Sequence, residues 1–422
     1  MRGGKVAGGA AIVAATASAA STRVACHSVQ TVIVGAGTFG ASLAWTLARA
    51  GEDVVLVDQF EPGDRRATSG GESRLIRCSH GGDALYTASA WRARTLWREL
   101  EGETGEDLMA EIGMAWFAQR EDGWEAESER AMTAQGIPCE RLDPAAAAKL
   151  YPSLGTDDLA FVLYEPEAGV VRAQRAVQAL ARQAVAHGAK LVRGRATPDG
   201  DAALVGGERL EGDAVVWACG GWLGSLFADH VPLKVTCQEL LFFDGGPAWR
   251  SPGVPGFVDY DLAMYGTGDL DDLGVKVALD EEGPPLDPDA ELPAAGATEP
   301  AVREYLARRF PALADAPLKE GRCCRYELSA DSNFIAARHP ELERTWIVGG
   351  GSGHGFKHGP ALAERVAGAL RGRRSRTARS SCAGVPRPTA MPRSSAASGS
   401  RATRSCGRAV VGWAACSPIT CR

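Results

Sequence analysis

A short glycine-rich stretch, "VIVGAGTFG" at residues 32–40, constrains this chain more than any other. Its glycines stand between a β-branched apolar run and residues 43–48, where Leu and Ala recur at helical spacing. A second apolar run, residues 54–57, follows and ends on Asp58. Strand, glycine loop, helix, strand and terminal acid in this order predict a doubly wound unit that binds a dinucleotide.

Each glycine of the loop has a mechanical reason. Gly35 allows a tight turn, Gly37 lets the backbone approach a pyrophosphate, and Gly40 lets the helix pack closely on the strand. The free amides at the helix start then face the phosphates. Asp58 is placed to bind the ribose hydroxyls of the adenosine half. The alternative is a purely structural glycine turn, and the loop alone leaves NAD and FAD both open.

Charge and composition exclude several other classes. The net charge is −6, 45% of the residues are hydrophobic and 23% are charged, as in ordinary globular proteins. This balance predicts neither nucleic acid nor an anionic membrane surface as a partner. No apolar run reaches the roughly 18 residues that suggest a spanning helix. There is no CxxC pair, so no metal site is expected, and the cysteine spacing suits a reducing compartment.

Both ends of the chain differ in character from the rest. Residues 1–28 have early cations and an Ala/Gly/Val centre, and they are interpreted as a disordered leader, with an export signal as the alternative. Residues 372–422 contain no Asp, Glu, Lys or Leu and are rich in Arg, Ser, Ala and Pro. Such a composition predicts a disordered or frame-shifted basic tail, with a nucleic-acid-binding tail as the sharper alternative. The expected location is the cytoplasm.

The loop-and-helix pattern returns near residue 350. The stretch "RTWIVGGGSGHGFKHGPALAERVAGALRG" again places a glycine loop between a strand and a helix. Residues 231–329 hold strand-like pieces, "QELLFFD" and "GVKVALD", without any dinucleotide signature. We therefore expect a cofactor domain assembled from discontinuous segments and a separate sheet that covers the substrate.

Six motifs together resemble a known family. They are "VIVGAGTFG" with Asp58, "GGESRLIR", "AVVWACGGW", "GVKV", "CCRYELSADSNFIAARHP" and "GGSGHGFK". The combination is similar to the D-amino-acid-oxidase-like flavoproteins, within them to the monomeric sarcosine oxidase and N-methyltryptophan oxidase group, over residues 29–371. The resemblance implies a monomeric enzyme that oxidises an amine C–N bond with FAD and reduces O2 to H2O2.

The resemblance also implies a mixed α/β (α+β) fold with two domains. A Rossmann-type FAD-binding domain would comprise residues 29–107, 165–230 and 329–371. An antiparallel-sheet substrate domain would comprise residues 108–164 and 231–328.

Several cofactor contacts follow from the resemblance. Cys324 stands seven residues before Asp331 and ten before Phe334, the register of the cysteine that tethers the flavin in this group. Neighbouring arginines at 322 and 325 would favour its thiolate. Without the resemblance, a buried inert cysteine is the simpler interpretation. Arg74 matches a position beside the flavin, and further FAD contacts are expected from Gly351, Gly353, His354 and Gly355.

The substrate side follows from the same motifs. Arg77 and Lys357 match the cations that hold a substrate carboxylate in the group. Lys276 matches the lysine at which oxygen is activated, where a fixed positive charge favours superoxide formation. A solubilising lysine on an edge strand is the alternative for Lys276. Tyr265 matches a tyrosine of the substrate pocket.

Two departures put sarcosine itself in doubt. Asp280 stands where sarcosine-specific enzymes have a histidine, and Gly70 replaces a histidine often found before the Gly-Glu-Ser-Arg segment. The substrate expected is therefore a carboxylate-bearing primary or secondary amine, without a more exact identity. Two other functions stay open, a dehydrogenase that uses another electron acceptor and an inactive flavin-binding protein.

Overall fold

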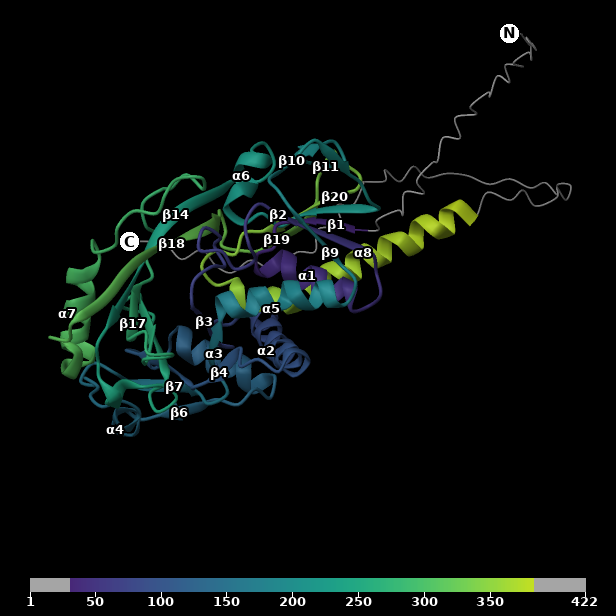
Figure 1. Ribbon diagram of the computed structural model, residues 1–422. Helices are drawn as coiled ribbons and strands as arrows, with labels where there is room; N and C mark the ends of the chain where they lie inside the picture. Colours follow the sequence, from purple (N-terminus) through teal and green to yellow (C-terminus); the bar gives the residue numbers. More distant parts are fainter. Residues whose placement is uncertain (1–30, 383–422) are drawn as a thin grey trace, which may run out of the picture.

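The computed structural model describes residues 31–382 of the chain, so the expected leader and the tail from residue 383 onward lie outside the described residues. Two large sheets dominate the fold, with helices around them (Figure 1). No helix among the described residues is long and apolar enough to cross a membrane. The fold is of mixed α and β type, as the sequence predicts.

The first sheet has six strands built from distant parts of the chain. Its order is β19 (Ile335–Arg338), β20 (Thr345–Gly349), β13 (Ala214–Trp217), β1 (Thr31–Val34), β2 (Val54–Asp58) and β9 (Lys190–Arg193). All pairs are parallel except β19 with β20. Because parallel strands are buried on both faces, β1 reads as an uninterrupted apolar run and is buried throughout.

The two faces of this sheet have different covers. Helix α1 (Thr38–Ala48) packs against α5 (Ala173–Ala186) and α8 (Gly359–Cys382) on one face, and α2 (Ala84–Thr104) packs on α8 (Figure 1). A small sheet of β10 (Ala196–Asp199), β11 (Ala202–Val205) and β12 (Glu208–Leu210) contributes apolar side chains to the core on the other face. Val185 of α5 is 44% exposed, because the buried face of the helix ends one residue earlier, at Ala184.

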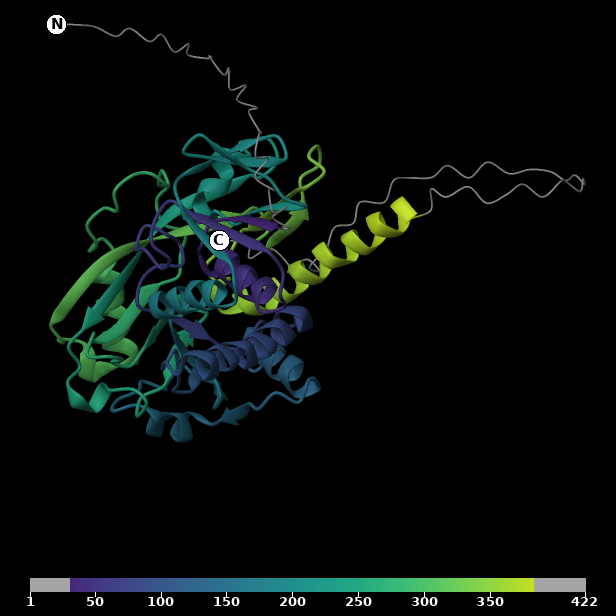
Figure 2. The same ribbon diagram turned by 45° about the vertical axis from the view of Figure 1, so that its right-hand side comes forward.

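Helix α8 extends beyond the body of the molecule (Figure 2). It continues to Cys382, whereas the sequence interpretation begins the irregular tail at residue 372. The difference has a local reason, since Arg is the most frequent residue of this segment and favours helix.

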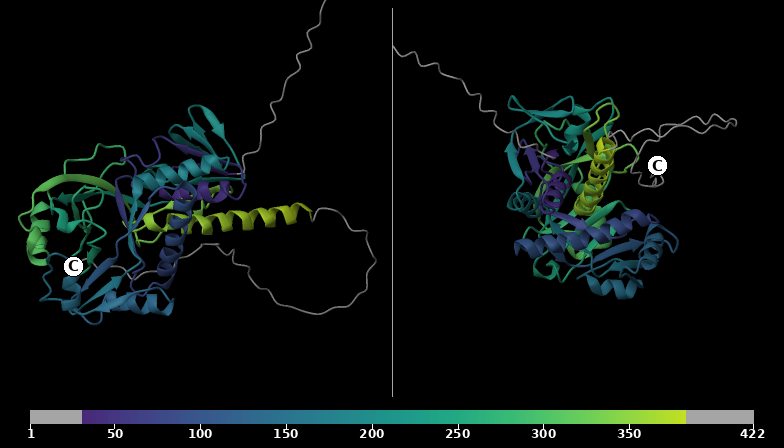
Figure 3. Two further views of the ribbon diagram at one scale, coloured as in Figure 1. Left: turned by 60° about the horizontal axis from the view of Figure 1, so that its bottom comes forward. Right: turned by 90° about the vertical axis from the view of Figure 1, so that its right-hand side faces the viewer.

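The second sheet has eight strands and lies toward the end of the molecule that carries α7 (Glu299–Arg309), away from α8 (Figure 3). Its order is β18 (Leu318–Ser329), β14 (Leu233–Phe243), β17 (Val275–Leu279), β16 (Met264–Thr267), β15 (Gly256–Asp259), β5 (Met114–Ala118), β7 (Phe161–Glu165) and β6 (Glu140–Leu142). The sheet is not purely antiparallel, because β5 and β15 pair in parallel. Helix α7 packs into its apolar face, and α3 (Trp124–Ala134) lies against β5 and β7.

A third, three-stranded sheet joins the two parts. It consists of β3 (Ser73–Ile76), β8 (Gly169–Arg172) and β4 (Met109–Glu111). The strands of the six-stranded sheet all come from segments expected to bind the cofactor, and those of the eight-stranded sheet come from segments expected to cover the substrate. The boundaries of the two domains stay a prediction, because β4 of one segment pairs with β8 of the other.

Candidate functional site

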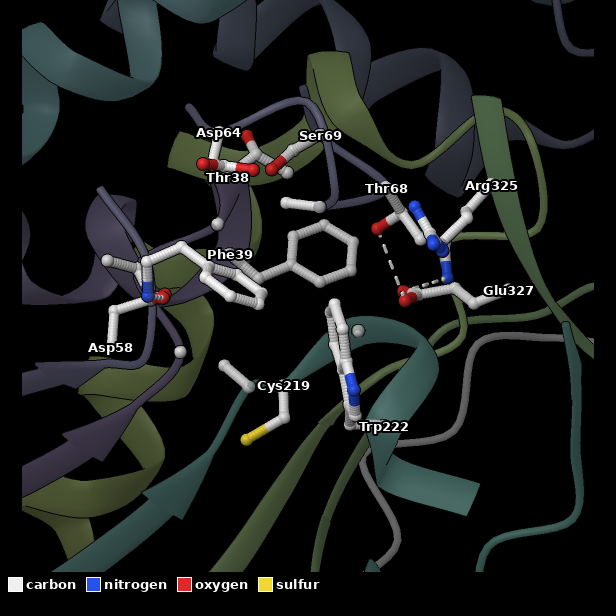
Figure 4. Close-up of a pocket in the computed structure, with 18 of the residues that line it drawn as sticks. Thr38, Phe39, Asp58, Asp64, Thr68, Ser69, Cys219, Trp222, Arg325 and Glu327 are labelled. Atoms are coloured by element: carbon white, nitrogen blue, oxygen red, sulfur yellow. Dashed lines mark hydrogen bonds between the residues drawn. The ribbon is translucent and has the colours of Figure 1, made fainter. Parts of the chain in front are cut away.

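A large cavity opens where β1 gives way to α1 (Figure 4). Its empty space, including the part open to solvent, is about 1160 Å³. The lining comes from both glycine loops, the end of β2, the segment before β3, the turn after β13 and the strand β18. Segments more than 300 residues apart in the sequence therefore meet around one space.

The first glycine loop has room for nothing but hydrogen at two positions. Gly35 has a φ of +103°, and a Cβ there would lie 2.3 Å from the carbonyl oxygen of Ala218. A Cβ on Gly40 would lie 1.8 Å from the Gly35 carbonyl oxygen. Helix α1 then begins after Gly37 without a side-chain cap, so its first amide groups have no such partner. This arrangement is suited to an anionic group such as a pyrophosphate.

Asp58 ends β2 at the edge of this cavity. Its carboxylate accepts hydrogen bonds from the backbone N–H of Ala36 at 2.5 Å and of Phe60 at 2.7 Å. Burial raises the pKa of Asp58, and these two N–H groups together with Arg193 oppose that rise. The side chain thus fixes the loop and lines the cavity at the same time.

The second glycine loop follows β20 and closes the other side of the cavity. Gly353 has a φ of +74°, and a Cβ there would lie 2.7 Å from the ring of Tyr326. A Cβ on Gly355 would approach the ring of Phe39 to 2.9 Å. Glycine is therefore required where this loop packs against β18 and α1. His354 stays neutral, because burial and the nearby Lys357 lower its pKa to about 3.

Two side-chain polar atoms of the lining lack a partner within the described residues, Ser69 Oγ and Arg325 Nε. Ser69 is 5% exposed, and its hydroxyl Oγ makes no hydrogen bond. A buried hydroxyl without a partner is costly unless a ligand supplies one. Together with the uncapped start of α1, this orphaned hydroxyl fits a bound dinucleotide.

Arg77 and Lys357 form a second group beside the cavity. The Arg77 guanidinium donates to the carbonyl of Ser79, and Lys357 Nζ donates to the His354 carbonyl oxygen at 2.9 Å. Lys357 is 3% exposed. Burial, and then the charge of Arg77, hold the pKa of Lys357 well below its usual value. Among the described residues, neither cation forms an ion pair, so the pair is ready to bind an anion.

Glu165 stands behind Arg77 but is already saturated. Its carboxylate accepts hydrogen bonds from the Cys78 N–H at 2.6 Å, from the Ser79 N–H and hydroxyl, and from the Trp116 indole at 2.9 Å. The Arg77 guanidinium lies over the Trp116 ring, 4.8 Å from its centre. Burial lowers the pKa of Arg77, and the charge of Glu165 opposes that shift while the Glu165 oxygens are held by other donors.

Lys276 lies in the interior of the eight-stranded sheet, since β17 has β14 on one side and β16 on the other. It is 4% exposed, and its Nζ donates to the carbonyl oxygen of Ser73 at 3.3 Å. The solubilising edge-strand alternative is therefore wrong. Burial, followed by the charge of Arg74, lowers the pKa of Lys276 to about 7.

Tyr265 and Cys324 lie near Lys276. The Tyr265 hydroxyl lies 3.2 Å from that of Tyr326, and the Lys276 Nζ lies 5.8 Å from the centre of the Tyr265 ring. Burial raises the pKa of the Cys324 thiol, while Arg74 and Lys276 oppose that rise. The structure corrects one expectation here. Arg325 does not favour the thiolate, because alternate residues of a strand face opposite sides, and its guanidinium donates to the carbonyls of Arg66 and Ala290.

The two departures from the family pattern, Gly70 and Asp280, lie in different structural environments. At Gly70 a Cβ would lie 2.3 Å from the Asp64 carbonyl oxygen, so this loop has no room for a side chain. Asp280 directly follows β17 and falls on the same face as Lys276, four residues earlier. The Asp280 side chain is exposed, yet protein atoms crowd it enough that burial raises the pKa of its carboxyl, which Arg77 and Lys357 lower.

The cavity brings together only part of the predicted set. Seven of the predicted residues line it, namely Gly35, Gly37, Asp58, Arg74, Gly351, Gly353 and Gly355. Gly40 packs behind the loop instead, and His354, Cys324, Lys276, Tyr265, Arg77 and Lys357 lie outside this lining. Arg74 links the two groups, because it lines the cavity and its charge acts on Lys276 and Cys324.

Sequence reasoning missed several lining residues, among them Thr68, Ser69, Trp222 and Glu327 (Figure 4). Thr68 and Ser69 belong to the polar segment just before the Gly-Glu-Ser-Arg motif, so the motif could have been extended by two residues. Glu327 lies three residues past Cys324 within the last but one motif. No local pattern singles it out, because β18 also carries the charged residues Lys319, Glu320, Arg322 and Arg325.

Comparisons with known proteins agree with this geometry. A sequence model of the family described as "DAO: FAD dependent oxidoreductase" matches residues 30–369. Monomeric sarcosine oxidase of a Bacillus species is 29% identical over 350 residues, which is 79% of this chain and 90% of that protein. N-methyl-L-tryptophan oxidase of Salmonella arizonae is 26% identical over 351 residues, 80% of this chain and 93% of the relative.

Solved structures share the fold. L-proline dehydrogenase from P. horikoshii superposes with a TM-score of 0.70 at 21% identity, covering 81% of this chain and 92% of the other. Iminodiacetate oxidase from Chelativorans sp. superposes with a TM-score of 0.68 at 24% identity, covering 81% of this chain and 95% of the other.

Proposed function

Because this chain belongs to the DAO family of FAD-dependent oxidoreductases, we propose that it is an oxidase of carboxylate-bearing amines. It converts the C–N bond of a primary, N-methyl or cyclic secondary amino acid to an imine and reduces O2 to H2O2. The observation that carries this proposal is the pair of buried cations, Arg77 and Lys357, which have no ion-pair partner among the described residues.

The pair explains why the substrate should carry a carboxylate. Two positive charges held close together repel each other, and the charge of Arg77 adds to burial in lowering the pKa of Lys357. A carboxylate between them removes this repulsion and satisfies the guanidinium with two hydrogen bonds. Fixing the carboxylate also fixes the position of the adjacent C–N bond, which is what an oxidation at that bond requires.

The remaining residues divide the chemistry between them. FAD, when bound, accepts a hydride equivalent from the substrate carbon and transfers two electrons to O2. The two glycine loops and Asp58 hold the cofactor. Lys276 supplies a buried positive charge that stabilises the superoxide anion formed first. Tyr265 would line the substrate pocket, and Asp280, whose carboxyl interacts electrostatically with Arg77 and Lys357, would offer an anion to the substrate amine.

The test is H2O2 formation under air with a panel of sarcosine, proline, pipecolate and N-methyl aromatic amino acids. We expect peroxide with at least one member, and loss of the visible flavin absorbance when the same compound is added without oxygen. If a substrate bleaches the flavin but no peroxide forms under air, the protein is a dehydrogenase and the oxidase assignment is wrong. A coloured protein that no amine of the panel bleaches would overturn the proposal.

Cys324 carries a second part of the proposal, a covalent link to the flavin. Formation of this thioether would remove one hydrogen from the thiol and one from a ring methyl group, and O2, the oxidant of the proposed reaction, would take up both as H2O2. The cationic groups of Arg74 and Lys276 support this role, since both favour the thiolate. Acid precipitation tests it, because a covalent flavin stays fluorescent in the pellet. Flavin recovered wholly in the supernatant excludes the link.

A further inference from the structure

A buried carboxyl group, that of Glu327, projects from β18 into the cavity (Figure 4). Glu327 is 5% exposed. Its Oε1 accepts a hydrogen bond from the N–H of Gly351 at 3.1 Å, and its Oε2 accepts one from the Thr68 hydroxyl at 3.4 Å. The side chain therefore connects the second glycine loop to the segment before β3, inside the space that the dinucleotide fits.

No cation neutralises this carboxyl within the described part of the chain. The guanidinium of Arg325, two residues away on the same strand, donates hydrogen bonds to the carbonyl groups of Arg66 and Ala290. Arg74 also lines the cavity near Thr68. Its guanidinium donates hydrogen bonds to the carbonyl oxygens of Ser73, Thr68 and Gly70. A buried carboxylate without a cation is costly, so a stable fold favours the neutral acid.

Two glycines leave the space that the carboxyl group occupies. A Cβ on Gly220 would lie 2.7 Å from Oε2 of Glu327, and a Cβ on Gly351 would lie 3.3 Å from Oε1. The turn after β13 and the loop after β20 thus fit around the carboxyl group from both sides. It is part of the built wall of the cavity and not a surface acid that happens to point inward.

None of the groups around Glu327 prevents its carboxyl from being protonated near neutral pH. Burial raises its pKa to about 7, and only the hydrogen bonds from Gly351, Thr68 and Gly350 oppose that rise. Cys219, across the turn after β13, is itself neutral, because burial and the charge of Asp58 raise the pKa of its thiol. The pyrophosphate of FAD would add negative charge and exclude water, and both effects favour the neutral acid further.

We propose that Glu327 is an FAD-binding residue that meets the cofactor as a neutral carboxylic acid, so that FAD binding takes up one proton near neutral pH. This role rests on the cofactor of the family and goes beyond the proposed amine oxidation, because no substrate is involved. The protonated carboxyl can donate its O–H to an acceptor atom of the cofactor while Gly351 and Thr68 continue to hold its other lone pairs.

The first test reads the proton directly in the holoprotein. Infrared difference spectra between the wild type and Glu327→Gln, recorded between pH 6 and 8, should contain the carbonyl band of a protonated carboxylic acid. We expect this band to persist in the oxidised holoprotein above the pH at which an ordinary glutamate has ionised. A carboxylate band in its place throughout this range would overturn the proposal.

The second test measures FAD affinity against pH by the quenching of flavin fluorescence, in the Cys324→Ser background so that binding is reversible. Affinity should fall up to about tenfold per pH unit above pH 7, since one proton is taken up on binding. Glu327→Gln, which keeps the shape and stays neutral, should bind FAD about as well as the protonated form and lose this pH dependence.

The matched control is Glu61→Gln. Glu61 lines the same cavity but is exposed and paired with Arg193, so the variant should keep the pH dependence of the parent protein. Three results would overturn the proposal. They are an affinity that rises with pH, a pH dependence unchanged by Glu327→Gln, and a Glu327→Gln protein that fails to bind FAD at any pH while its circular dichroism shows a folded chain.

Discussion

At the scale of single residues, the site is characterised by buried ionisable groups that have no ion-pair partner among the described residues. Lys357, Arg77, Lys276 and Glu327 are ionisable groups whose pKa values are all shifted toward the neutral form by burial. Proteins rarely keep such groups inside unless a ligand or a reaction needs them. We propose that two of them bind the substrate carboxylate, one assists the reaction with oxygen and one contacts the cofactor.

Lys357→Met removes one half of the proposed carboxylate clamp. Loss of a charge-assisted contact of about 1.5–3 kcal/mol should raise KM for a carboxylate substrate roughly 10- to 100-fold, with little change in flavin content. Steady-state kinetics and the flavin absorbance check both parts. Lys149→Met, on an exposed lysine, is the control. An unchanged KM, or an equal loss with an amine that lacks the carboxylate, would remove Lys357 from the clamp.

Lys276 gives a pH dependence with a definite sign. Its pKa is lowered to about 7, so the ammonium is present below that pH and is lost as the pH rises through it. A reduced, negatively charged cofactor beside it would move this transition upward. The rate at which O2 reoxidises the anaerobically reduced protein should therefore fall between pH 7 and 9.

The variants of this lysine separate charge from structure. Lys276→Met should reoxidise slowly at every pH, while its reduction by substrate stays close to that of the wild type. Lys276→Arg should keep its charge over the whole range and so lose the pH dependence. Reoxidation by the methionine variant at the wild-type rate would show that this charge does not assist the oxygen step.

At the scale of elements, helices and strands are joined by buried charge as well as by apolar packing. Arg309, at the end of α7, is fully buried and pairs with the fully buried Asp259 of β15 at 2.9 Å. It also pairs with Asp158 at 2.8 Å. This network attaches α7 to the sheet that carries Lys276 and Tyr265.

Arg309→Met should destabilise the protein strongly, because Asp259 would remain buried without its cation. We expect a loss of about 3–5 kcal/mol in the free energy of unfolding by urea. Arg308→Met is the matched control on the same helix. Arg308 pairs with Asp158 as well, but its side chain is 51% exposed, so its loss should cost less than about 1 kcal/mol. Similar losses for both variants would contradict the assignment.

At the scale of the whole molecule, the cofactor cavity is closed by loops from opposite ends of the described chain. The loop before α1 and the loop after β20 both line it, and β18 of the second sheet forms part of its wall (Figures 1 and 4). A ligand that contacts all three holds the two sheets together. Its free energy of binding is therefore added to the stability of the folded chain.

Thermal unfolding with and without cofactor should show this linkage. Apoprotein from flavin-starved cells should melt at a lower temperature than the holoprotein. FAD at about 1,000 times its dissociation constant should add about 4 kcal/mol, equivalent to several degrees. AMP, which fills only the adenosine half, serves as the control and should stabilise less. Equal melting temperatures for apoprotein and holoprotein would mean that the cavity is not the binding site.

Local signals were enough for the cofactor half of the fold. The run from β1 through α1 to Asp58 is continuous in the sequence, so its periodicity and glycine spacing predicted both the elements and their order. The same pattern of strand, glycine loop and helix predicted β20, the second glycine loop and the start of α8. The parallel pairing of β5 with β15 was missed, since those strands are more than 130 residues apart and no local pattern connects them.

The sequence by itself determined that a dinucleotide site is present, which the family resemblance narrows to FAD, and which residues carry charge, because spacing and residue chemistry are local properties. Only the tertiary structure decided how those charges behave. It placed Lys276 inside a sheet instead of at its edge, turned Arg325 away from Cys324, and aimed Glu327 into the cofactor cavity without a cation. The physical reason is that burial and distance between groups set a pKa, and both depend on segments that meet only after the chain has folded.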